Sequence, residues 1–210
     1  MFITFEGVEG SGKSTQAKLL AEFLTQQGHK VVLTREPGWG HLGELIRRVI
    51  LDKRDLQLEP FSELCLFCAD RAQHVRDFIK PRIKEGGIVI CDRYFDSTVV
   101  YQGHGRNLEK GLVNKIAKAS TLGLVPDITF LLNLPVSTGI DRLQSRDEIT
   151  KMDEEPLEFH EMIRQGYMLL ARMEPDRIKK VDADRDISDV HEEIKGLAQN
   201  FITSKTTREF

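Results

Sequence analysis

Near its N-terminus the chain reads Gly7-Val8-Glu9-Gly10-Ser11-Gly12-Lys13-Ser14. The apolar run Phe2–Phe5 precedes these residues, and a helical pattern that starts at Thr15 follows them. Strand, glycine-rich loop and helix together are the context in which G-x-x-x-x-G-K-[ST] binds nucleotide phosphates. Glycines let successive backbone N–H groups point at one place, where the helix N-terminus adds the positive end of its dipole. We therefore predict a polyphosphate site, with Lys13 at the β- and γ-phosphates and the Ser14 hydroxyl on Mg²⁺.

The chain has 210 residues, of which 40% are apolar, and a net charge of −3. We predict one α/β domain at residues 1–203 and a polar tail at residues 204–210. Because a nucleic-acid-binding surface is usually basic, the charge argues against a nucleic-acid partner. No apolar run approaches the roughly 20 residues that span a bilayer, and the first residues lead into a strand rather than a signal peptide. We expect a cytoplasmic protein with no membrane partner.

Three cysteines do not make a disulfide framework, but Cys65 and Cys68 form a C-x-x-C sequence. A zinc site needs a second ligand pair, which Cys91 alone does not supply, and a redox motif needs a thioredoxin-like setting. Cys65 and Cys68 both fall on the apolar side of a helical pattern. We expect them to pack in the core as small apolar side chains.

Apolar runs alternate with helical patterns along the chain. The runs predict strands at Phe2–Phe5, Val31–Leu33, Ile88–Cys91, Ile128–Leu132 and Ile178–Val181. The helical patterns cover residues 13–27, 42–51, 59–85, 109–121, 136–145, 156–174 and 187–202. Continuously apolar strands are typical of a parallel sheet that is buried on both faces. The expected fold is α/β with three layers, α/β/α: a P-loop NTPase fold whose parallel sheet of about five strands is flanked by helices.

Polar residues follow four of these strands, and ligands of parallel sheets bind beyond the carboxyl ends of the strands. Asp92 ends an apolar strand, where a carboxylate commonly holds Mg²⁺ through water in phosphate-loop enzymes. Arg93 beside it offers a planar fork to a second phosphate group. Asp92 and Arg93 could also tie the strand end to a neighbouring element. Arg47 lies on the helix after the second strand, where it could face inward or remain solvated.

The motifs around the predicted nucleotide site distinguish a GTPase from a kinase. The GTPase sequences D-x-x-G and N-K-x-D do not follow the expected strands. Arginines opposite a phosphate loop suit a second anionic substrate, and phosphoryl transfer mostly requires positioning and charge neutralisation. The sequence therefore favours an ATP-dependent kinase that acts on a small molecule.

Five segments occur in order: Phe5–Gln16, Arg35–Gly38, Phe67–His74, Asp92–Tyr94 and Tyr101–Gly103. Together they strongly resemble thymidylate kinases, over residues 2 to about 185. The Phe-Cys-Ala-Asp-Arg-Ala-Gln-His block at Phe67–His74 is more diagnostic than the phosphate loop, which many unrelated enzymes share. The resemblance implies Mg²⁺-dependent transfer of the ATP γ-phosphoryl group to dTMP by a homodimer packed through helices. Two alternatives stay open: a kinase for another nucleoside monophosphate or a deoxynucleoside, and a nucleotide-gated binding module with slow hydrolysis.

The resemblance also implies how dTMP is held. Glu9 would accept a hydrogen bond from the sugar 3′-hydroxyl, and Tyr101 would crowd a 2′-hydroxyl and so favour deoxyribose. Phe67 would stack on thymine and Arg71 would bond a thymine carbonyl; their spacing of four places them on one helix face. Arg47 and Arg93 would hold the monophosphate. The remaining implied dTMP contacts are Glu36, Pro37, Ser97, Thr98 and Gln102, and the Glu36-Pro37 peptide is a cis candidate that would aim Arg35 and Glu36 into the site.

On the donor side, the resemblance implies ATP contacts from Gly7 through Thr15 and from Arg142, and a contact of the backbone near Ala183 with the adenine. One subtype of the family carries an arginine in the phosphate loop, where this chain has Gly10. The charge on the transferring group must then come from a mobile lid at about residues 142–155. Arg146 is the first candidate and Lys151 the second, since lysine lacks the bidentate fork of arginine. These lid charges could equally be solvated.

A second departure from the family concerns Trp39. Many bacterial relatives read Arg-Glu-Pro-Gly-Gly-Thr, whereas Trp39 and Gly40 follow Gly38 here. Tryptophan does not easily adopt backbone angles that only glycine favours, so we expect an altered loop. Trp39 would then be either a lid over the nucleotide or an interface residue.

Overall fold

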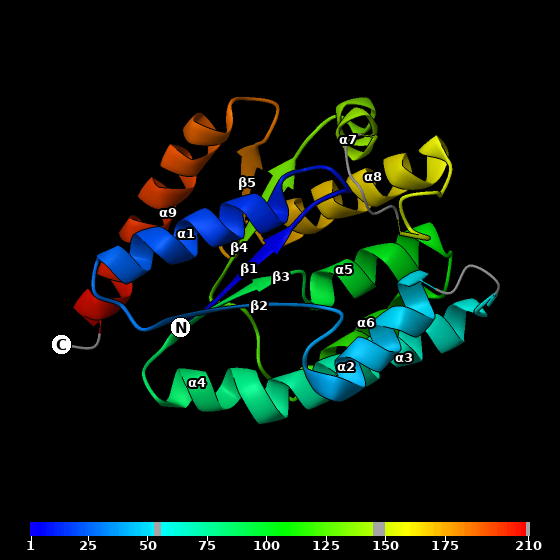
Figure 1. Cartoon of the computed structure of the whole chain (residues 1–210), viewed down its shortest axis with the longest axis horizontal. Coiled ribbons are helices and arrows are strands. Elements are labelled where there is room, and N and C mark those ends of the chain that lie inside the picture. Colours follow the sequence, from blue (N-terminus) through cyan, green and yellow to red (C-terminus); the bar gives the residue numbers. More distant parts are fainter. Residues whose placement is uncertain (53–55, 145–149, 209–210) are drawn as a thin grey trace.

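The computed structural model describes residues 1–52, 56–144 and 150–208. Its centre is one sheet of five parallel strands in the order β2-β3-β1-β4-β5 (Figure 1). The strands are β1 (Phe2–Glu6), β2 (Val31–Arg35), β3 (Ile88–Asp92), β4 (Ile128–Asn133) and β5 (Ile178–Asp182). The predicted α/β fold with five parallel strands is confirmed.

Each strand continues one or two residues beyond its predicted apolar run. The last residue is always polar: Glu6, Arg35, Asp92, Asn133 or Asp182. The parallel ladder includes these residues, since Arg35 lies opposite Asp92 and Asn133 opposite Asp182. Hydrogen bonding of the backbone, which continues past the last apolar side chain, therefore sets where the strands end. Polar side chains consequently gather at one edge of the sheet.

Helices cover both faces of the sheet. They are α1 (Lys13–Gln26), α2 (Gly40–Arg47), α3 (Pro60–His74), α4 (Lys80–Lys84), α5 (Phe95–Val100), α6 (Lys110–Ser120), α7 (Val136–Leu143), α8 (Leu157–Met173) and α9 (Ile187–Arg208). Figure 1 shows α1 and α9 side by side on one face, with α3 to α6 on the other. Turns of π-helix at Arg48–Asp52, Val75–Ile79 and Tyr101–Gly105 continue α2, α3 and α5. None of the helices in the described ranges is both long and apolar enough to cross a membrane.

The helix formed by α5 and its π-helical continuation was not predicted from the sequence. The segment contains Thr98, Val99 and Val100, whose branched side chains lower helix propensity, followed by Gly103 and Gly105. Nearly all of α5 is buried. Packing against α6, α8 and the sheet edge therefore overrides the weak local preference.

Two further expectations are corrected. The C-terminal helix α9 continues to Arg208, so residues 204–208 of the predicted polar tail are helical. Lys205 forms an ion pair with Asp127, which attaches this end to the sheet. Cys68 is buried as expected, but Cys65 is exposed, because it lies on the outer side of α3.

A buried ion pair attaches α5 to the rest of the fold. The Arg177 guanidinium donates to both carboxylate oxygens of Asp96, at 2.7 and 2.8 Å, and also to Thr129 Oγ1 on β4 at 2.9 Å. Asp96 is 2% exposed and Arg177 8%. Two-point pairing of this kind fixes the position of α5, which carries several of the predicted site residues.

We predict that Arg177→Ala lowers the free energy of unfolding by about 3–5 kcal/mol, because it leaves the Asp96 carboxylate buried without its partner. Urea denaturation of the purified protein measures this change. The control is Lys18→Ala, which removes an exposed ion pair of 3.9 Å with Glu22 and should change the stability by less than about 1 kcal/mol. Equal effects of the two substitutions would show that Arg177 does not stabilise the fold in this way.

Candidate active site

The glycine-rich loop closes tightly between β1 and α1. Gly7, Gly10 and Gly12 have φ angles of 145°, 71° and 88°, which favour glycine. A Cβ on Gly10 would lie 2.2 Å from the carbonyl oxygen of Gly139 on α7. The Lys13 ammonium lies inside the loop and donates to the carbonyls of Gly7 and Val8 at 3.0 and 2.7 Å. The local sequence thus folds into a tight turn between strand and helix, a shape that suits a phosphate group.

An open cavity of about 190 Å³ lies beside this loop. Most of the predicted site residues line it: Glu9, Gly10, Gly12, Lys13, Ser14, Glu36, Pro37, Arg47, Phe67, Arg71, Asp92, Arg93, Ser97, Thr98, Tyr101 and Gln102. They come from the ends of β1, β2 and β3 and from α2, α3 and the α5 segment. In the described chain, the cavity lining does not include the predicted residues Gly7, Val8, Ser11, Thr15, Arg142, Lys151 or Ala183.

Ser14 and Asp92 present oxygen ligands at the mouth of the loop. The Ser14 hydroxyl donates to Asp92 Oδ2 in a short contact. Asp92 Oδ1 is buried and accepts no hydrogen bond from the described residues. A carboxylate and a hydroxyl are the donor types that Mg²⁺ prefers, so these two side chains fit a magnesium ion.

Glu9 is the centre of a buried polar network. Its carboxylate accepts from Arg93 at 2.9 Å and from the Tyr101 hydroxyl, and lies 3.2 Å from His160 Nδ1. Burial alone would raise the pKa of Glu9, but the Arg93 charge and the His160 hydrogen bond outweigh it and lower the pKa to about 2. Glu9 is therefore a fixed anion and a strong acceptor. Sequence reasoning missed His160, because a single histidine on an amphipathic helix carries no signal of its own.

Three arginines crowd the side of the cavity that faces α2. Arg93 has a φ of 69°, a left-handed angle that is uncommon outside glycine and aims its side chain across the loop. Burial lowers the pKa of Arg47, and the nearby Arg35 charge lowers it further. All three line the cavity. Cations held this close together repel one another unless an anion lies between them, so the arrangement suits a phosphate group.

A flat apolar wall and a buried guanidinium form the opposite end of the cavity. Phe67 and Arg71 lie one turn apart on α3 and both line the cavity that contains Lys13. Arg71 is 2% exposed and donates from Nε to Glu36 Oε2 at 2.8 Å. The Glu36-Pro37 peptide is cis, as expected from the resemblance. A planar ligand with an acceptor on its edge fits between this ring and this guanidinium.

The lid residues are only partly described. Thr150, Met152 and Asp153 line the cavity, whereas the Lys151 ammonium donates to the Leu56 carbonyl at 2.9 Å. Arg146 lies outside the described residues.

Arg142 and Trp39 lie away from the cavity. The Arg142 guanidinium donates to the carbonyls of Gly10 and Ala183, at 3.5 and 3.4 Å, and so links the outer side of the phosphate loop to the end of β5. Trp39 does not cover the cavity either, because its ring stacks on His74.

Comparison with known proteins identifies the family. The model of the thymidylate kinase family matches residues 5–194. A thymidylate kinase of Desulfovibrio desulfuricans is 46% identical, over 90% of this chain and 91% of that protein. A thymidylate kinase of Roseiflexus sp. is 41% identical, over 100% of this chain and 98% of that protein. The crystal structure of thymidylate kinase from Ehrlichia chaffeensis superposes with a TM-score of 0.76 at 35% identity and covers 94% of this chain and 98% of its own. The chain therefore belongs to the thymidylate kinase family.

Proposed function

We propose that this protein transfers the γ-phosphoryl group of ATP to dTMP, which gives dTDP and ADP. One observation carries the proposal beyond the family match: Phe67 and Arg71 share a cavity with Lys13 of the phosphate loop. A pair of side chains that suits a planar base and a loop that suits polyphosphate therefore border the same cavity. The relatives named above carry the same activity in their names, and nothing in the described site favours a different nucleoside monophosphate.

The donor side follows from the loop. The backbone N–H groups and Lys13 hold the phosphates of ATP, and Lys13 stabilises charge that develops on the transferring group. We propose that Ser14 and Asp92 hold Mg²⁺, which supplies further neutralisation of phosphate charge when it is bound. Arg142 and Ala183 are our candidates for contacts near the adenine.

The acceptor side needs no general base. A phosphate monoester is already ionised near neutral pH, so an oxygen of dTMP attacks the γ-phosphorus directly. A new P–O bond forms to that oxygen, and the bond from the γ-phosphorus to the β–γ bridging oxygen breaks, with ADP as the leaving group. Arg47 and Arg93 align the attacking phosphate. This alignment lowers the activation barrier, because the reacting groups are already positioned when both substrates are bound.

The nucleoside is selected by shape and by hydrogen bonds. Phe67 stacks on the base, and Arg71 donates to a carbonyl of thymine. Glu9 accepts from the 3′-hydroxyl, and its low pKa keeps it ionised for that bond. Tyr101 donates to Glu9 and, as the family resemblance implies, would crowd a 2′-hydroxyl. Thr98 and Gln102 complete the lining beside the base.

The lid and the assembly are further parts of the proposal. Arg146 remains our first candidate for the lid cation; Lys151 would have to exchange its bond to the Leu56 carbonyl for a phosphate oxygen. We also propose a cytoplasmic homodimer, which the family resemblance implies. Leu42 and Leu45 of α2 and Phe61 of α3 are 44%, 42% and 42% exposed, as an interface through these helices would require. A monomer mass of the purified protein in analytical ultracentrifugation would overturn the proposed dimer.

We predict that dTMP is the preferred acceptor when ADP release is measured with a panel of dTMP, dCMP, UMP, AMP and GMP. Lys13→Ala should lower kcat with dTMP by about 10²–10³-fold, because one preorganised charge on the transferring group is lost. Removal of divalent ions with EDTA should abolish turnover, and added Mg²⁺ should restore it. A preference for another monophosphate would contradict the substrate; full turnover by Lys13→Ala would contradict the site.

Arg71→Ala should lower kcat/KM for dTMP by about 10- to 100-fold, since a charged hydrogen bond to the base is removed. The ratio of kcat/KM for dTMP to that for dCMP should fall as well, because cytosine carries an amino group where thymine has its 4-carbonyl. Arg76→Ala serves as the matched control, because Arg76 lies on the same helical run with its charge paired to exposed Asp77. If the ratio stays at its wild-type value in Arg71→Ala, Arg71 does not read the base.

The pH dependence should report Lys13. Burial, and then the Arg93 charge, lower the pKa of Lys13 to about 8. The protonated ammonium is the active form, so kcat/KM for ATP should be constant well below pH 8. Above pH 8 it should decrease with the slope expected for loss of a single proton. Measurement from pH 6.5 to 9.5 with saturating dTMP tests this, and a profile that stays flat to pH 9.5 would exclude Lys13 as the titrating group.

A further inference from the structure

Trp39 and His74 form a stacked pair beneath the base-binding end of the cavity. Their rings lie 5.3 Å apart between centroids with an interplanar angle of 19°. His74 is completely buried, and the Phe78 ring lies 5.7 Å from it at 22°. Trp39 has ordinary extended angles, φ −86° and ψ 130°. The positive φ angles fall instead on Gly38 and Gly40, so the loop accommodates tryptophan without strain at that residue.

Hydrogen bonds extend from this pair to the base-reading arginine. His74 Nδ1 lies 3.0 Å from Glu36 Oε1, and His74 Nε2 lies 2.9 Å from Thr34 Oγ1. A carboxylate can only accept, so Nδ1 carries the proton, and in the neutral ring Nε2 accepts from the Thr34 hydroxyl. The other oxygen of Glu36 accepts from Arg71 Nε at 2.8 Å.

These bonds leave part of the Arg71 guanidinium for a ligand. Besides Glu36, Arg71 donates to the Tyr94 carbonyl at 3.3 Å and to Ser120 Oγ at 3.4 Å. Among the described residues, three of its five N–H groups are therefore used by the protein, which leaves two for a ligand in the cavity that Arg71 lines. The plane of the guanidinium is set by these bonds, and the bond to Glu36 is the shortest of them.

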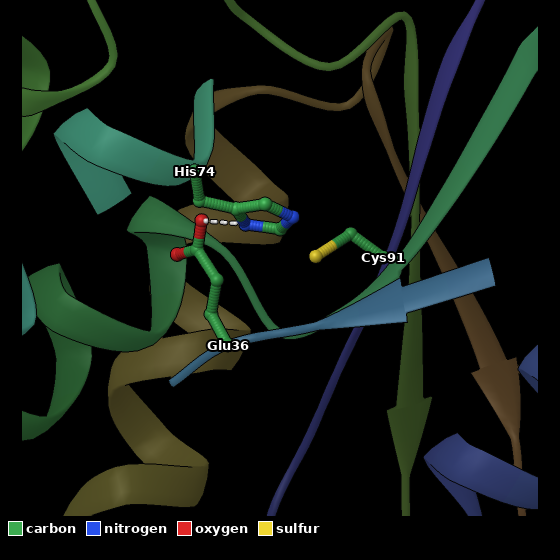
Figure 2. Close-up of side chains that lie close together, drawn as sticks. All are labelled: Glu36, His74 and Cys91. Atoms are coloured by element: carbon green, nitrogen blue, oxygen red, sulfur yellow. Dashed lines mark hydrogen bonds and ion pairs between the residues drawn. The ribbon is translucent and has the colours of Figure 1, made fainter. Parts of the chain in front are cut away.

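The same cluster contains three types of residue that can bind a metal, but their hydrogen bonds and protonation are not those of metal ligands. Candidate ligand atoms of Glu36, His74 and Cys91 lie within 4.8 Å of one another. Figure 2 shows the His74 ring between Glu36 and Cys91, with Nδ1 directed at the carboxylate. The Cys91 thiol donates to the Arg93 carbonyl, and burial raises its pKa well above the usual value, so the protonated thiol is favoured here. Both ring nitrogens of His74 and both carboxylate oxygens of Glu36 are already hydrogen-bonded. This arrangement indicates that the two residues hold Arg71 in a fixed position.

We propose that His74 and Trp39 are positioning residues for base selection. His74 holds the Glu36 carboxylate, Glu36 holds the edge of Arg71, and the stacked Trp39 ring keeps the imidazole in its plane. The inference rests on the proposed function, in which Arg71 donates to a thymine carbonyl. Without the His74 donor, Glu36 would lose one of its two buried partners and rotate, and Arg71 would lose its orientation toward the base.

The loop that carries Trp39 is itself held on α3. Asp70 Oδ2 accepts from the Gly38 backbone N–H at 3.1 Å. A Cβ on Gly43 of α2 would lie 2.4 Å from Asp70 Oδ1, so α2 approaches α3 closely at this point. Asp70 and His74 lie one helical turn apart, and together they attach the segment around Gly38 and Trp39 to the helix that carries Arg71.

Steady-state kinetics with dTMP and dCMP tests the proposal. His74→Leu should raise KM for dTMP about tenfold and lower the dTMP/dCMP ratio of kcat/KM by a similar factor, as expected for one lost buried hydrogen bond. The kcat at saturating dTMP and KM for ATP should stay within about twofold of wild type, because the phosphate loop is untouched. His74→Asn, which can still donate near the Nδ1 position, should recover most of the selectivity.

Two substitutions at Trp39 give an independent test at a half-buried position where folding is less at risk. Trp39→Ala should raise KM for dTMP about threefold and lower the dTMP/dCMP ratio of kcat/KM by a similar factor, since the stacked ring is removed. Trp39→Phe keeps an aromatic ring and should behave as wild type. The matched control is Gln73→Ala, which alters the neighbouring surface residue of α3 that donates to Asp77.

The outcomes separate this proposal from the proposed function. A wild-type enzyme with no preference for dTMP over dCMP would contradict the substrate, and the positioning role with it. A wild-type enzyme that prefers dTMP, with selectivity unchanged in His74→Leu and Trp39→Ala, would overturn the positioning role alone. A fall in kcat together with rises in KM for both ATP and dTMP would likewise overturn it, because these changes would indicate a general structural role.

Discussion

Two buried carboxylates hold two of the arginines that line the cavity, Arg93 and Arg71, and the site depends on these pairs. Glu9 binds Arg93 at 2.9 Å and Glu36 binds Arg71 at 2.8 Å. A buried cation without a partner is strongly destabilising, whereas a guanidinium paired along one edge keeps further N–H groups for a ligand. The cavity can therefore present oriented positive charge before a substrate arrives. Preorganised charge of this kind needs little rearrangement during the reaction.

The sheet brings these pairs together. Glu9 and Glu36 follow β1 and β2, and Arg93 follows β3, which lies between those two strands in the sheet. Neighbouring parallel strands end at the same edge, so residues far apart in the chain meet there. The phosphate loop is held in place on its other side, since Gly10 packs directly on the backbone of α7 at Gly139. Any side chain at Gly10 would have to displace that helix.

The tryptophan that departs from the usual family pattern packs against the helical run that carries Phe67 and Arg71. Its ring packs on His74 and on Phe78, away from the loop that binds phosphate. Local backbone strain is avoided because glycines on both sides take the unusual angles. Trp39 is not among the residues that line the cavity, so its support of Glu36 and Arg71 passes through His74.

Much of the architecture could be read from local patterns. Apolar runs located all five strands, the glycine pattern located the phosphate loop, and the spacing of four placed Phe67 and Arg71 on one face of α3. These features depend on backbone geometry and on residues near in sequence, so they are visible without a structure. The polar residue that ends each strand lies just beyond the predicted apolar run, because strand length depends on pairing with the neighbouring strand.

Other features were decided by contacts between distant parts of the chain. The α5 helix forms despite its branched residues because it is buried, and Cys65 is exposed although Cys68, one turn away, is not. His160 reaches Glu9 across 151 positions of sequence, and the pairing of His74 with Glu36 spans 38. The sequence by itself determined the five strands, the glycine-rich loop and the helices other than α5, because local hydrogen bonding and apolar periodicity suffice for those. Only the tertiary structure decided which polar side chains share a buried environment, because burial and charge pairing are properties of the packed chain.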